Sequence, residues 1–150
     1  MSLYLKRLAR QVKNVLSRYI EIHDALNNVT MRHWLPIPGV FKRIPFDVYA
    51  KDLSGLLAAI ENLRFEIREN PKADTAFADV LEEYSQALQV AIEKLQRFCL
   101  NLAQQARGGT KYNFFKQKSD YGEYAKAVKR YVILGEKLNL EFNRISGRFN

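Results

Sequence analysis

The stretch FADVLEEYSQALQVAIEKLQRFCLNL, residues 77–102, repeats apolar side chains at intervals of three and four residues from end to end. The repeating positions are Phe77, Val80, Leu81, Tyr84, Leu88, Ala91, Leu95, Phe98, Cys99 and Leu102. This spacing puts them on one face of an α-helix. A helix with a single apolar face is unstable alone in water, so this face must pack against other elements.

Three further segments, residues 5–26, 46–67 and 124–145, show the same helical period. No segment alternates apolar and polar side chains with the period of two that marks a half-buried strand. The sequence therefore predicts an all-α fold, a four-helix bundle without a sheet. Antiparallel packing is the first choice, although a long first connection would also permit a parallel first pair.

Helix start and stop signals predict where the connections lie. Asn70-Pro71 followed by Asp74-Thr75 predicts a tight hairpin between the second and third helices. Gly108-Gly109 ends the third helix, and Ser119 or Asp120 with Glu123 resembles a capping box that opens the fourth. The first and third connections are accordingly expected to be long.

Length and composition favour one compact domain over residues 1–150. The chain is 47 % apolar, which suffices for one core. Its 150 residues are too few for two domains. Cys99 is the only cysteine, so no intramolecular disulfide can form, and we expect a cytoplasmic protein. No apolar run is long enough to span a bilayer. The basic first 20 residues resemble a targeting or membrane-surface helix, but their apolar stripe favours a core-facing helix.

Positive charge is concentrated at the two ends of the chain. The formal net charge is +8; residues 1–44 hold eight basic and two acidic side chains, and residues 108–150 hold nine and four. Opposite their apolar stripes, the first and last helices carry basic positions. These are Lys6, Arg10 and Lys13 on the first helix and Lys126, Arg130, Lys137 and Arg144 on the last. If the two helices are neighbours, these side chains form one cationic face. The alternative is that each basic stripe is only the solvated face of its own helix.

Lysines alternate with aromatic residues in residues 110–118. Lys111, Phe114 and Lys116 suit single-stranded nucleic acid, because aromatic rings stack on bases while lysines pair with phosphates. The structural alternative is that Phe114 and Phe115 plug the core.

Two other features favour contacts between proteins. Trp34 lies in an apolar connection, residues 31–44, which either caps one end of the bundle or presents an exposed aromatic anchor. Phe65, Val90 and Leu100 lie off the apolar stripes of their own helices, which favours a homo-oligomer interface.

No motif predicts catalysis, a cofactor or a metal site. Arg18 and His23 have an Arg-x4-His spacing that resembles HEPN-type ribonucleases, small helical bundles with both residues on one helix face at a dimer cleft. The pair lies on the first predicted helix rather than a late one, and Tyr19 replaces a residue that is usually polar. His23 is better explained as a hydrogen-bonded structural histidine, and Glu82-Glu83 as part of a solvated helix face.

The sequence thus favours a non-enzymatic binding module whose cationic face engages an acidic partner, either nucleic acid or protein. The second hypothesis is a structural or assembly protein that forms a helical homo-oligomer. A HEPN-like ribonuclease is a distant third.

Overall fold

The computed structural model describes residues 3–32, 45–69, 75–106 and 114–147, without the side chains of a few residues at the helix ends. These ranges form four helices: α1 (Leu3–Arg32), α2 (Phe46–Glu69), α3 (Thr75–Ala106) and α4 (Phe114–Gly147). No strand occurs in them. The predicted all-α, four-helix fold is confirmed.

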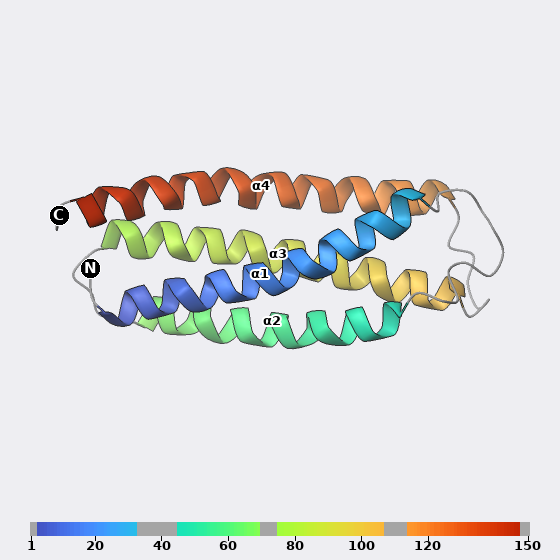
Figure 1. Cartoon of the computed structure of the whole chain (residues 1–150), viewed down its shortest axis with the longest axis horizontal. Coiled ribbons are helices and arrows are strands. Elements are labelled where there is room, and N and C mark those ends of the chain that lie inside the picture. Colours follow the sequence, from blue (N-terminus) through green and yellow to red (C-terminus); the bar gives the residue numbers. More distant parts are fainter. Residues whose placement is uncertain (1–2, 33–44, 70–74, 107–113, 148–150) are drawn as a thin grey trace.

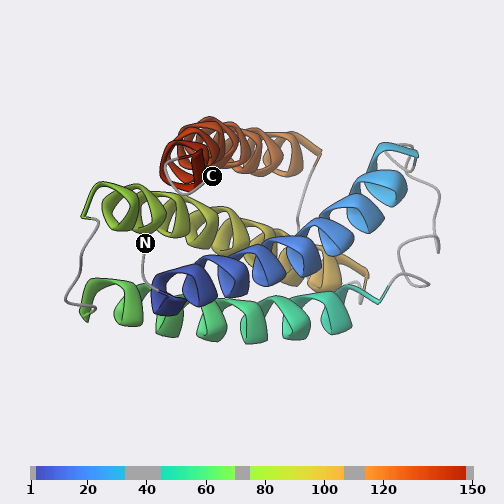
Figure 2. The ribbon, with the colours of Figure 1, turned by 60° about the vertical axis from the view of Figure 1, so that its left-hand side comes forward.

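The helices alternate in direction along the chain, as an antiparallel bundle requires (Figure 1). α2, α3 and α4 lie side by side with α3 in the middle, and α1 crosses one face of this layer diagonally (Figures 1 and 2). α1 packs on α2 and α3, while α3 contacts all three other helices. The bundle is therefore organised around α3.

The central position of α3 explains its wide buried arc. All ten apolar positions of residues 77–102 are buried, as the sequence predicts. The core also includes α3 residues outside that stripe: Ala78, Ser85, Ala87, Ile92 and Ala103. A helix with neighbours on three sides buries more of its circumference than the single face that a helical period defines.

α4, at the edge of the layer, buries less of its apolar stripe than the helical period predicts. Tyr124, Tyr131 and Ile145 of α4 are buried, but Phe142 is 39 % exposed although the helical period assigns it to the core. Phe142 does touch Phe77 of α3, with ring centroids 6.2 Å apart. Because α4 packs mainly on α3, only a narrow part of its apolar stripe is covered.

Two helix ends differ from the sequence prediction. α4 begins at Phe114 instead of near Ser119, and α1 continues to Arg32. Neither glycine nor proline occurs between Thr110 and Tyr121 or between Asn27 and Arg32, so nothing in these segments stops a helix. The third connection is therefore shorter than predicted. Trp34 and the rest of its connection after Arg32, residues 33–44, lie outside the described residues.

A glycine permits close packing of α4 on α3. A Cβ atom added at Gly135 would lie 3.2 Å from Cε2 and 3.8 Å from Cδ2 of the buried Tyr84 ring. Gly122, on the same helix, has no such neighbour within 4 Å.

We predict that Gly135→Leu destabilises the protein by about 1–3 kcal/mol, because the larger side chain must displace the Tyr84 ring. Gly122→Leu is the matched control and should stabilise by up to about 1 kcal/mol through helix propensity. Urea unfolding followed by circular dichroism measures both. Equal effects of the two substitutions would contradict the close α3–α4 packing.

Candidate cationic binding surface

The first half of α1 carries positive charge without acidic neighbours on the helix. Lys6, Arg10 and Lys13 are exposed and make no ion pair with the described residues. Arg7 stands over the ring of Tyr4, with 5.0 Å between its guanidinium carbon and the ring centroid. The first acidic residue of the helix is Glu21. Acidic residues of α1 itself therefore do not offset the positive potential of this segment.

Three of the four predicted cations of α4 have acidic partners. Lys126 Nζ lies 3.3 Å from Glu123, and Arg144 Nη2 lies 2.7 Å from Glu141. Lys137 Nζ lies 3.9 Å from Glu83 of α3. Exposed pairs of this kind contribute little stability, but they lower the net positive charge of the α4 surface. Arg130 is exposed and has no ion pair within the described ranges.

The diagonal path of α1 separates the two basic stripes. The first half of α1 lies over α2, and no backbone contact joins the described residues of α1 and α4 (Figure 2). Lys137 reaches Glu83 on α3 instead. The expected arrangement, with the two helices as neighbours along one cationic face, is not found; the structure holds two cationic groups.

The lysine-aromatic segment is also apart from the α1 cations. α4 begins at Phe114, and this end lies at the same end of the bundle as the end of α1, opposite the end where α1 begins (Figure 1). Lys116 is exposed in the first turns of α4. Lys111 and the side chain of Phe114 lie outside what the structure describes.

A groove with both polar and apolar lining residues lies between α1 and α2, beside the basic half of α1. Its volume is about 310 Å³, and Arg7, Gln11 and Asn14 of α1 face Asn62 and Glu66 of α2 across it. Its apolar lining residues are Val15, Ala59 and Leu63. The three carboxamides make no hydrogen bond with the described residues, so they remain able to bind a ligand.

A buried tyrosine pair connects α1 to α4. The hydroxyls of Tyr19 and Tyr124 form a hydrogen bond, and Nδ1 of His23 lies 2.5 Å from the Tyr124 hydroxyl. Tyr131 meets the Tyr19 ring edge-on, with centroids 5.8 Å apart. Burial raises the pKa of both hydrogen-bonded tyrosines, so their hydroxyls stay protonated. The helical periods of residues 5–26 and 124–145 include both rings, but no sequence pattern pairs their hydroxyls.

The Arg18 and His23 side chains contact different helices. Arg18 pairs with Glu21 at 2.9 Å and with Asp52 of α2 at 3.2 Å, whereas His23 contacts Tyr124 of α4. Burial lowers the pKa of His23, and Asp24 opposes this shift. The geometry agrees with the structural interpretation of His23 and gives the ribonuclease hypothesis no support.

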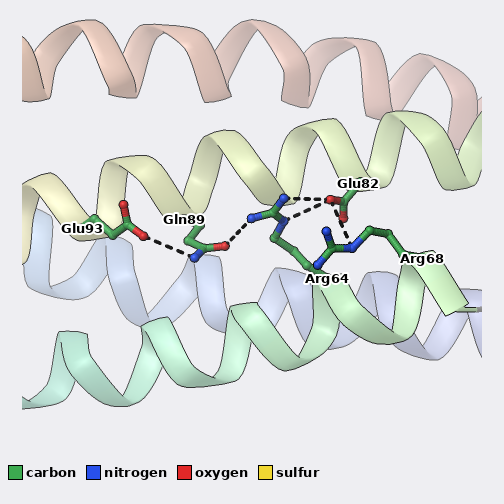
Figure 3. Close-up of polar contacts among 5 residues, drawn as sticks. All are labelled: Arg64, Arg68, Glu82, Gln89 and Glu93. Atoms are coloured by element: carbon green, nitrogen blue, oxygen red, sulfur yellow. Dashed lines mark hydrogen bonds and ion pairs between the residues drawn. The ribbon is translucent and has the colours of Figure 1, made fainter.

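Sequence reasoning missed a polar network between α2 and α3 (Figure 3). Arg64 donates to Glu82 Oε1 from Nε at 3.1 Å and from Nη2 at 2.9 Å, and to Gln89 at 2.7 Å. Gln89 donates in turn to Glu93 at 3.3 Å, and Arg68 lies 3.9 Å from Glu82. Glu82 is thus a half-buried partner of α2 and not part of a solvated face. No signal within either helix predicts this pairing.

Family models, curated proteins and solved structures yield no match to the chain. In the described ranges, no three His, Cys, Asp or Glu side chains gather as a metal site would require. None of the described helices is apolar enough over a sufficient length to cross a bilayer.

We predict that His23 makes stability depend on pH. Its folded-state pKa lies below the ordinary value of about 6.5, so the unfolded chain takes up the proton first as pH falls. The contribution of neutral His23 is complete above about pH 6.5 and is lost as pH falls toward the lowered pKa. Melting temperatures of wild type and His23→Gln between neutral and mildly acidic pH test this. The variant should show the flatter profile; parallel profiles would contradict it.

Proposed function

We propose that the chain is a small non-enzymatic binding module whose cationic α1 surface engages nucleic acid. The observation that carries the proposal is the unpaired charge of Lys6, Arg10 and Lys13, on a half-helix without acidic residues. Cations on an exposed helix neutralise phosphates of a polyanion and release its condensed counterions. Such contacts bind without reading sequence.

The groove beside α1 supports the same proposal. Carboxamides of Gln11, Asn14 and Asn62 can donate to and accept from base edges. The paired cations of α4 are a secondary surface, since each already has a carboxylate nearby. Glu66 in the groove wall disfavours phosphate there, which assigns phosphate binding to the exposed α1 side chains.

Reversal of the unpaired α1 charges should abolish binding more effectively than reversal of paired charges. We predict that Lys6→Glu/Arg10→Glu/Lys13→Glu strongly weakens binding of labelled single-stranded RNA or DNA in fluorescence anisotropy. The matched control, Lys126→Glu/Lys137→Glu/Arg144→Glu, makes the same charge change at paired positions and should weaken binding less. For about four phosphate contacts, log affinity should fall with log salt at a slope of about −3.

Two outcomes would overturn the proposal. Absence of binding at low salt would exclude nucleic acid, and equal loss in both triple variants would show that net charge alone, and not the α1 surface, determines binding. Binding to an acidic polypeptide but to no nucleic acid would identify an acidic protein as the partner instead.

The second candidate function is that of a structural or assembly protein that forms a helical homo-oligomer. It is favoured by the exposure of Phe65 (61 %), Val90 (38 %) and Leu100 (46 %), large apolar side chains that the bundle leaves uncovered. Val90 and Leu100 both belong to α3, the helix whose other faces are packed.

A further inference from the structure

The face of α3 that its neighbours leave uncovered forms a regular stripe. Its positions alternate by four and three residues, which is the a/d spacing of a coiled coil. All of these side chains are exposed: Gln86, Val90, Glu93, Arg97, Leu100 and Gln104. A stripe with this spacing runs nearly straight along the helix and can pack against a second helix along its whole length.

Positions of the stripe at equal distances before and after Leu95 carry side chains that suit one another. Glu93 and Arg97 lie two residues to either side of Leu95, with opposite charges. Val90 and Leu100 lie five residues to either side, and both are apolar. The outer pair, nine residues away, is Gln86 and Gln104. A two-fold axis at this level would bring together the members of each pair from two antiparallel copies of α3.

The charged pair is available for contacts with a second copy. Arg97 is exposed and has no ion pair within the described residues, although i,i+4 spacing places Glu93 within reach on the same helix. One Glu93 oxygen instead accepts from Gln89, which Arg64 holds in turn (Figure 3). This hydrogen bond engages only Oε1 of Glu93, so the second carboxylate oxygen and the Arg97 guanidinium have no partner within the described residues.

We propose that the exposed stripe of α3 is an isologous interface on which a second copy of this chain packs antiparallel. Glu93 of each copy pairs with Arg97 of the other, and on either side Val90 packs against Leu100. Four apolar side chains and two ion pairs form a small interface, so the dimer is of the weak class. The inference rests on the second function proposed above and is independent of the α1 surface.

A charge exchange tests the pairing. Glu93→Arg places Arg against Arg in the two-fold pair, and Arg97→Glu places Glu against Glu. Each single variant should raise the dimer dissociation constant about ten-fold in sedimentation velocity. Glu93→Arg/Arg97→Glu should restore it, and an equimolar mixture of the two single variants should form heterodimers. Glu136→Arg, an exposed change on α4, is the control and should leave the dimer unchanged.

Spin-label distances test the antiparallel register. A cysteine placed singly at Gln86 or at Gln104 lies nine residues from the axis. In the antiparallel dimer the two copies of that cysteine lie on opposite sides of the axis, about 27 Å apart along the helix, which gives about 30 Å between the labels. A parallel dimer would instead give about 10 Å at both. Cys99 will stay unlabelled, because it is buried and burial raises the pKa of its thiol to about 12.

The outcomes distinguish failure of the α3 interface from failure of the wider assembly function. A protein that stays monomeric up to millimolar concentration overturns both. An oligomer whose charge exchange is not rescued, or whose labels at positions 86 and 104 lie close together, overturns the α3 interface and leaves the assembly function standing. Circular dichroism of every variant confirms that the helices are intact.

Discussion

The packing of α3 against all three other helices is the constraint on which the rest of the structure depends. Burial of Leu81, Leu88, Ile92 and Leu95, none of which is more than 2 % exposed, supplies the apolar contact area of the core. With three sides occupied, α3 has one face left for water. The same packing keeps α2 and α4 apart, so each of them has surface that no other helix covers.

The diagonal path of α1 follows from where its partners lie. The first half of α1 packs over α2, and its second half reaches α4 through the hydroxyls of Tyr19 and Tyr124 and the imidazole of His23. Buried hydroxyls without partners are costly, so this hydrogen-bonded group fixes the position at which α1 and α4 meet. The same path separates the cations of α1 from those of α4.

The sequence predicted what a single helix encodes. Apolar periodicity identified all four helices and most of the core, and it placed Phe65, Val90 and Leu100 outside the core, where the structure leaves them exposed. The sequence did not predict which residues of different helices contact one another. Burial of Ala87 and Ile92 depends on α3 having three neighbours, and the Arg64–Glu82 pair depends on how α2 and α3 align. Likewise, the sequence predicted that the basic positions of α1 and α4 face solvent, but their division into two groups depends on how α1 crosses the other helices.

Native-state hydrogen exchange tests the central role of α3 most directly, because amide protection reports the free energy of local opening. The slowest-exchanging amides should lie in α3 between Leu81 and Leu95, and amides of α4 beyond Leu138 should exchange faster, since α4 is packed mainly on one side. If the amides of α3 exchanged as fast as those at the end of α4, α3 would not be the helix that holds the bundle together.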